Sequence, residues 1–248
     1  MGWIQKIGLF IAAIPATIAG FLLCVARPFH RGNNKLCARM YAWGGLRVLN
    51  TRVRLEGWQH LPAERPHVLV ANHQSNLDLY FYGSITPENA VVVGKKSLGW
   101  IPFFGQMFWL GGNVLIQREH RQKAMSAMTA ANQAIACKGQ SVWILSEGTR
   151  SRGRGLLPFR KGAFQTAITT GAPISLICFS DYLTTYQQGA RGPHTVTARV
   201  LPPITTEHLG PGDEPELMAR CRALMIQHLT ELNGVSPVSH DEAGQQAA

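Results

Sequence analysis

A histidine and an aspartate lie five residues apart in a short polar stretch that follows an apolar run. The stretch reads ANHQSNLDLY over residues 71–80 and contains His73 and Asp78. A largely neutral imidazole can accept a proton from an alcohol, and a neighbouring carboxylate can fix its tautomer and stabilise the imidazolium. The two residue types therefore indicate a general base and its orienting partner.

The spacing requires a change of backbone direction between the two residues. In a regular helix, five residues turn through about 140° beyond a full circle, so the side chains would point apart. We expect a buried strand at 68–71, a loop that carries His73, and a helix that starts near Ser75 with Asp78 at its third position. Alternatively, Ser75 and Asp78 form only a capping box, and His73 is an ordinary loop residue.

Apolar runs alternate with helical patterns along most of the chain, which is typical of an α/β fold. The predicted strands lie at 68–71, 90–93, 114–117, 142–145, 174–179 and 196–201. Helices are predicted at 120–138 and 217–232, each followed by a glycine. We expect one mixed-sheet catalytic domain with flanking helices over residues 51–234. A membrane-anchoring and basic helical segment at 1–50 precedes it, and a disordered tail at 235–248 follows.

The composition favours anionic partners and a reducing compartment. Lysine and arginine total 24 against 14 acidic residues, which gives a net charge of +10. The five cysteines are scattered without a Cys-x-x-Cys spacing. Free thiols are thus expected, and neither a disulfide framework nor a zinc site is predicted.

Residues 7–26 carry no charge and are long enough to cross a bilayer as a helix. Pro15 and Gly20 interrupt the stretch, so a kinked or re-entrant hairpin in one leaflet is an alternative to a straight span. A buried core helix and a cleaved signal peptide are further alternatives. The positive charges that follow it are Arg27, Arg31, Lys35 and Arg39. This asymmetry predicts that the bulk of the chain lies on the cytoplasmic side of the cytoplasmic (inner) membrane.

Bulky apolar side chains also fill residues 99–112, GWIPFFGQMFWLGG. They cover too much of a helix or loop for one face to bury. The segment is expected to dip into the lipid interface or to wall a slot for an acyl chain, and ordinary core packing is the alternative for any single member.

A basic, glycine-rich run at 146–162, SEGTRSRGRGLLPFRKG, follows another predicted strand. Its guanidinium groups and backbone amides could surround a phosphate, and Arg118 ends the preceding strand. A solvated surface loop is the alternative, above all for Arg152 and Arg154. Nucleic acid is not the expected partner, because Phe159 is the one aromatic residue in the run.

Four ordered motifs together resemble the glycerolipid acyltransferase family. They are NHQSNLD at 72–78, the stretch 112–118, EGTR at 147–150 and API at 172–174. The runs GKKSLGWIPFFGQ and SEGTRSRGRGLLPFRKGAF are especially similar. The resemblance implies transfer of an acyl group from acyl-CoA or acyl-ACP to the free hydroxyl of lysophosphatidate, with phosphatidate as product. Another lysolipid or glycerol 3-phosphate as acceptor, a thioesterase, and a protein that only binds anionic lipid remain alternatives.

The resemblance also assigns roles to individual residues. It implies that His73 is the general base and that Asp78 is its partner. The residues implied in acceptor binding are Gly112, Arg118, Glu147, Gly148, Thr149 and Arg150. No cofactor, metal or nucleic acid is expected, and the bilayer is a partner. Ser146 and Gln117 depart from the family pattern, which usually has proline and often an acidic residue there, and a looser loop with a broader acceptor range is the expected consequence.

Overall fold

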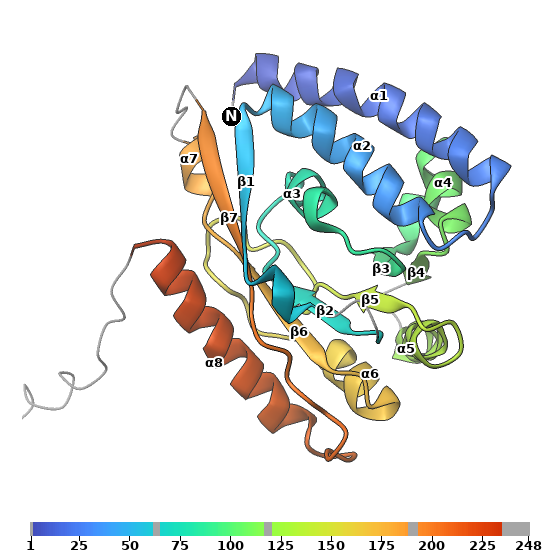
Figure 1. Cartoon of the computed structure of the whole chain (residues 1–248), viewed down its shortest axis with the longest axis vertical. Coiled ribbons are helices and arrows are strands. Elements are labelled where there is room, and N and C mark those ends of the chain that lie inside the picture. The colour runs from blue at the N-terminus through green and yellow to red at the C-terminus, as the bar shows by residue number, and fades with distance from the viewer. Residues whose placement is uncertain (1, 62–64, 117–120, 188–192, 235–248) are drawn as a thin grey trace, which may run out of the picture.

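A seven-stranded mixed sheet forms the centre of the computed structural model (Figure 1), which describes residues 2–61, 65–116, 121–187 and 193–234. The sheet order is β1-β7-β6-β2-β5-β3-β4, and only the β6–β7 pair is antiparallel. The strands are β1 Thr51–Glu56, β2 Val68–Ala71, β3 Ala90–Lys95, β4 Val114–Ile116, β5 Ser141–Trp143, β6 Ile174–Phe179 and β7 His194–Val200. The predicted mixed α/β fold is confirmed, and β1 is the strand that the sequence analysis missed.

The central strands β2 and β6 are buried along their whole length. Their near-continuous apolar sequences suit strands that are covered on both faces. The register aligns Val68 of β2 with Val142 of β5 and with Ile174 of β6. Because these strands are parallel, their carboxyl ends meet at one edge of the sheet, where α/β proteins collect functional residues.

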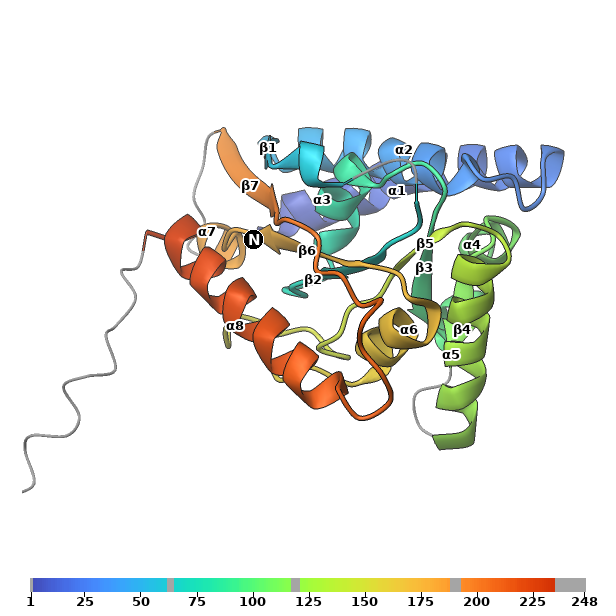
Figure 2. The same cartoon turned by 60° about the horizontal axis from the view of Figure 1, so that its bottom comes forward.

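Helices cover both faces of the sheet, as Figures 1 and 2 show. On one face lie α1 Trp3–Ala26, α2 Asn33–Val48, α3 Asp78–Ile85 and α4 Phe104–Leu110. On the other lie α5 Arg121–Ala136, α6 Gly162–Thr170 and α8 Glu214–Leu232. The short helix α7 Leu183–Gln187 follows β6, and the 3-10 turns are η1 Trp58–His60 and η2 Lys96–Trp100.

The apolar N-terminal stretch forms one unbroken helix, α1, which continues through Pro15 and Gly20. The expected alternative of a hairpin within residues 7–26 is therefore wrong; instead, α1 pairs with α2 (Figure 1). By length and composition, α1 is able to cross a membrane. Its most apolar window has a mean hydropathy of 2.4, and 22% of that window is buried. This low burial contradicts the alternative of a core helix.

The apolar segment at 99–112 lies beside the C-terminal half of α1. Trp100, Phe103 and Trp109 are exposed, whereas Met107 is buried. The Phe103 ring packs edge-on against Phe21 of α1, with 5.5 Å between the ring centroids. The segment thus extends the exposed apolar surface of α1 and contributes single members to the core.

The two helices predicted from the sequence, α5 and α8, are both present on the face of the sheet that α6 also covers. α8 is amphipathic as predicted, with Leu217, Cys221 and Met225 buried at a spacing of four residues. α5 lies within the predicted range 120–138. The predicted disordered tail at 235–248 lies outside the described residues.

Candidate active site

His73 and Asp78 are in direct contact at the carboxyl edge of the sheet. His73 lies in the loop after β2, and Asp78 is the first residue of α3. The imidazole Nδ1–H donates to Asp78 Oδ2. The Asp78 side chain is 4% exposed and that of His73 is 15% exposed. With Nδ1 engaged, Nε2 is the ring nitrogen left to accept a proton from a substrate.

The helix that carries Asp78 begins later than predicted. It starts at Asp78 and not near Ser75, because a turn occupies residues 76 and 77. Ser75 Oγ accepts a hydrogen bond from Leu77 N–H at 3.0 Å, and Asp78 Oδ2 accepts one from Ser75 N–H at 3.2 Å. Asp78 therefore caps this turn and contacts His73 at the same time, so the alternative that Ser75 and Asp78 form only a capping box is wrong.

The backbone of the histidine loop is held by the glycine-rich loop after β5. His73 N–H donates to Glu147 Oε1 at 2.5 Å. The His73 carbonyl accepts from Ser151 N–H at 2.7 Å, and the next carbonyl, of Gln74, accepts from Arg152 N–H at 3.1 Å. These bonds fix both the N–H and the carbonyl of His73.

Glu147 faces the protein interior and is 3% exposed. Its second oxygen, Oε2, accepts a hydrogen bond from Leu157 N–H at 3.0 Å. Burial raises the pKa of this carboxyl, and the two backbone donors oppose that rise. Both carboxylate oxygens thus bind backbone amides and join residue 73 to residue 157. A role of Glu147 in acceptor binding remains a prediction.

Two polar side chains next to His73 fasten the loop to the end of β6. Asn72 Nδ2 donates to the Phe179 carbonyl at 2.9 Å, and Phe179 N–H donates to Asn72 Oδ1 at 2.8 Å. Gln74 Nε2 donates to the Ser180 carbonyl at 3.0 Å. Asn72 and Gln74 belong to the recognised motif, but their positioning role was not predicted.

Tyr182, two residues after Ser180, contacts the Asp78 carboxylate and was not predicted from the sequence. Its hydroxyl donates to Asp78 Oδ1, and Tyr182 as a whole is 1% exposed. Burial and the Asp78 charge raise the pKa of Tyr182 well above its usual value. The sequence contains one indication of this contact. Tyr182 follows a buried strand, and the carboxyl end of that strand lies at the same edge of the sheet as the end of the strand before His73.

Three predicted acceptor-binding residues lie in the turn after Glu147. Gly148 has φ +70°, and a Cβ at this position would lie 2.3 Å from Arg160 Nε, so the guanidinium of Arg160 lies against the glycine. Thr149 is exposed. Arg150 is partly exposed, and its Nε is buried without a hydrogen-bond partner among the described residues. Arg150 is thus part of this turn, and the guanidinium group of Arg160 lies against it.

Two other predicted residues are not placed with this group. Gly112 lies just before β4, beside Val91 near the start of β3. This is the amino edge of the parallel strands, whereas His73 lies at their carboxyl edge. It has φ +82° and ends the turn after α4. Arg118 lies outside the described residues, as does Gln117.

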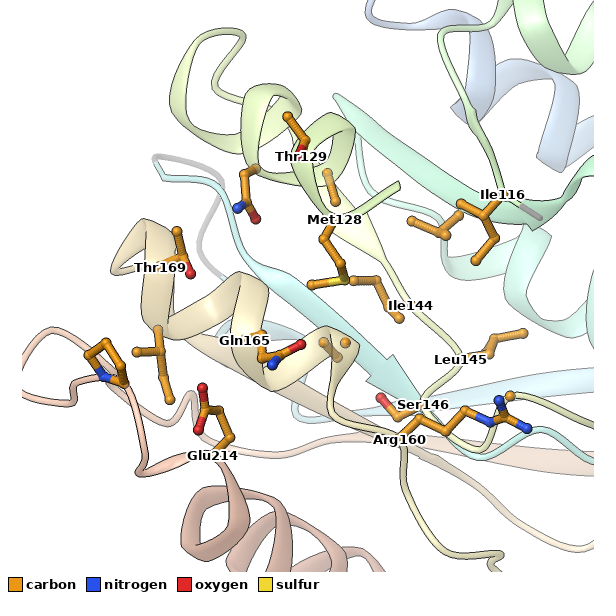
Figure 3. Close-up of a pocket in the computed structure, with 18 of the residues that line it drawn as sticks. Ile116, Met128, Thr129, Ile144, Leu145, Ser146, Arg160, Gln165, Thr169 and Glu214 are labelled. Carbon is orange, nitrogen blue, oxygen red and sulfur yellow. The ribbon is translucent and has the colours of Figure 1, made fainter. Parts of the chain in front are cut away.

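A cavity of about 920 Å³ opens next to the turn, between α5, α6 and the end of β5 (Figure 3). Ser146, Gly148 and Arg160 line one end, and Ile144, Met128 and Ile168 contribute to its apolar wall. The Ser146 hydroxyl is buried without a partner in the described part of the chain. The cavity therefore provides apolar space that begins beside the glycine-rich loop.

The chain matches a family model described as Acyltransferase over residues 52–180. It is 45% identical over 166 residues to the 1-acyl-sn-glycerol-3-phosphate acyltransferase of Salmonella typhimurium, covering 67% of this chain and 68% of that protein. It is 34% identical over 235 residues to the mouse 1-acyl-sn-glycerol-3-phosphate acyltransferase alpha, covering 94% of this chain and 79% of that protein.

A solved structure supports the fold assignment. The crystal structure of the 1-acyl-sn-glycerophosphate (LPA) acyltransferase from Thermotoga maritima superposes with a TM-score of 0.74 and 21% sequence identity. The match covers 92% of this chain and 94% of that chain. At this identity, the similarity concerns the arrangement of helices and strands.

Proposed function

The chain belongs to the acyltransferase family, and from this premise we propose that it transfers an acyl group to the free sn-2 hydroxyl of lysophosphatidate and forms phosphatidate. The contact between His73 Nδ1 and Asp78 Oδ2 is the observation that carries the proposal. It leaves a ring nitrogen available at an edge of the sheet that also holds cationic groups. The names of the relatives indicate the acceptor.

In the proposed reaction, His73 Nε2 takes the proton of the acceptor hydroxyl while the hydroxyl oxygen attacks the thioester carbonyl of the donor. Asp78 stabilises the imidazolium through its hydrogen bond to Nδ1. The tetrahedral intermediate then collapses, the carbon–sulfur bond breaks, and the leaving thiolate takes up the proton from the His73 imidazolium. Backbone amides or nearby cations stabilise the oxyanion, and no covalent enzyme intermediate is required.

Substrate binding in this proposal divides between the cationic turn and apolar surfaces. Arg150 and Arg160 supply guanidinium groups that suit the phosphate of the acceptor, because a guanidinium binds phosphate through paired N–H donors. Acyl-CoA or acyl-ACP is the proposed donor. The cavity beside Ser146 and Gly148 offers space for an apolar portion of a substrate.

Membrane association is indicated by α1 together with the similarity to bacterial relatives. We place the catalytic domain on the cytoplasmic side of the inner membrane, as the positive charges after α1 predict. Trp100, Phe103 and Trp109 would then lie with α1 at the lipid interface, where aromatic side chains are favoured. An enzyme held there meets its lipid acceptor in the plane of the bilayer.

The test combines detergent-solubilised protein, lysophosphatidate and an acyl thioester, and it follows both phosphatidate and free thiol. We expect both products from the wild-type protein. His73→Ala should abolish both signals, because the proton acceptor is lost. His208→Ala, which changes an exposed histidine in the loop before α8, is the matched control and should retain both.

The same assay distinguishes the alternatives. Free thiol without phosphatidate would replace the proposal with a thioesterase. Acylation of glycerol 3-phosphate or another lysolipid in preference to lysophosphatidate would change the acceptor. Full activity of His73→Ala would refute the role of the imidazole.

A further inference from the structure

In the described part of the chain, three groups donate hydrogen bonds to the two oxygens of the Asp78 carboxylate. Oδ2 accepts from His73 Nδ1–H and from Ser75 N–H, and Oδ1 accepts from the Tyr182 hydroxyl. A carboxylate can rotate about its Cβ–Cγ bond unless both oxygens are held. Here the tyrosine is the donor that holds the oxygen away from the imidazole.

We propose that Tyr182 is a positioning residue for acyl transfer, which fixes the Asp78 carboxylate so that its other oxygen meets the imidazole of His73. This inference rests on the proposed function of the His73–Asp78 pair. It adds a third side chain, 104 residues further along the chain than Asp78, and this side chain is buried behind the carboxylate.

The surroundings of Tyr182 make this role specific. Its ring is buried and lies 4.4 Å from that of Phe81, measured between centroids. Ser75 Oγ lies 3.2 Å from the hydroxyl and offers a neutral partner, but the proton is directed to the charged carboxylate, which forms the stronger hydrogen bond. The nearby Tyr82 hydroxyl donates to the Asn72 carbonyl. It also lies close enough to Asp78 that the carboxylate adds to the rise that burial causes in the pKa of Tyr82.

The chain offers a closely matched control. Tyr186 lies on the same short segment, is also buried, and its ring centroid is 6.2 Å from that of Tyr182. Its hydroxyl, however, bonds to Thr51 Oγ1 and not to the catalytic carboxylate. Tyr182→Phe and Tyr186→Phe therefore each remove a buried hydroxyl from one aromatic cluster, and Tyr182→Phe removes a bond to Asp78.

The experiment measures kcat and KM for donor and acceptor in the full-length protein. Tyr182→Phe should lower kcat about tenfold or more with both KM values within about twofold, because a lost charge-assisted hydrogen bond misaligns the base without removing a substrate contact. Tyr186→Phe should keep kcat within about twofold of wild type. A fluorotyrosine at position 182, which keeps ring and hydroxyl, should restore most of kcat.

A spectroscopic readout separates this inference from the proposed function. The Nδ1–H resonance of His73, assigned by its loss in His73→Ala, should shift in Tyr182→Phe and stay in place in Tyr186→Phe. This holds even if lysophosphatidate proves not to be the acceptor. Equal kcat values for the two phenylalanine variants, a change confined to KM, or an unmoved resonance in Tyr182→Phe would overturn the inference. If Tyr182→Phe fails to fold, the fluorotyrosine protein decides, because it must then retain both kcat and the resonance.

Discussion

Replacing Glu147 by glutamine distinguishes a residue that binds the acceptor from one that holds the loop carrying His73. The resemblance to the family implies the first role. In the structure, both carboxylate oxygens instead accept backbone N–H groups, from His73 at 2.5 Å and from Leu157 at 3.0 Å. The two roles predict different changes in the kinetic constants.

The magnitude follows from the hydrogen bonds. The side-chain amide in Glu147→Gln has one acceptor oxygen, so one of the two backbone N–H groups loses its partner and faces an NH₂ group. Such a loss costs roughly 2 kcal/mol for a buried donor to a charged acceptor. The substitution also removes a buried negative charge. Because burial disfavours that charge and raises the pKa of Glu147, its removal offsets part of this cost. A decrease in Tm of about 6 °C is the upper expectation.

The assay is steady-state kinetics with thermal unfolding on the same preparations. Displacement of the His73 backbone should lower kcat by about one to two orders of magnitude, since small misplacements of a catalytic group are costly, and leave the acceptor KM nearly unchanged. Glu56→Gln is the matched control, because Glu56 pairs with Arg199 on β1 and β7, away from His73. A large rise in the acceptor KM of Glu147→Gln with an unchanged kcat would refute this reasoning and favour direct contact with the substrate.

Two further predictions concern Arg150 and His67. Arg150→Ala should raise the KM for the phosphorylated acceptor about tenfold with little change in kcat, and Arg152→Gln, in the exposed part of the loop, is its kinetic control. His67 is fully buried, and burial lowers its pKa to about 4 from an ordinary value of 6.5. Between these values the unfolded state binds more protons, so the free energy of unfolding should fall by about 2 kcal/mol from pH 7 to about pH 5. Urea titrations of wild type and His67→Gln check this, and an equal pH dependence in both would contradict it.

The sequence predicted the elements that carry a strong local signal. Continuous apolar runs identified β2 and β6, and the spacing of Leu217, Cys221 and Met225 identified α8. β1 was missed because the sequence TRVRLE alternates charged and apolar residues at the outer end of the sheet, so the run is neither long nor uniformly apolar. The start of α3 was misplaced because the Asp78 carboxylate takes the Ser75 N–H and favours a turn ahead of the helix.

The contacts of the candidate site between residues close in sequence were predicted. The contacts between residues far apart in sequence were not. The spacing of His73 and Asp78 allowed a contact if the backbone changed direction between them, and the resemblance of the four ordered motifs selected that contact over a simple capping box. Tyr182 and the inward orientation of Glu147 depend on which strands are neighbours in the sheet. That order, with β2 between β6 and β5, cannot be read from hydrophobic patterns alone.

The position of α3 connects the Asp78 carboxylate to the N-terminal helix pair α1 and α2. α3 begins with Asp78 and packs directly on α2, where a Cβ on Gly83 would lie 2.4 Å from the Ala38 carbonyl oxygen. A second close approach runs from α2 to α3, where a Cβ on Gly45 would lie 2.1 Å from the ring of Tyr80. Because both contacts require glycine, the two helices approach more closely than larger residues allow. Helices α1 and α2 therefore share a core with the helix that begins at Asp78, so membrane attachment through α1 would also set where the proposed active site lies relative to the lipid surface.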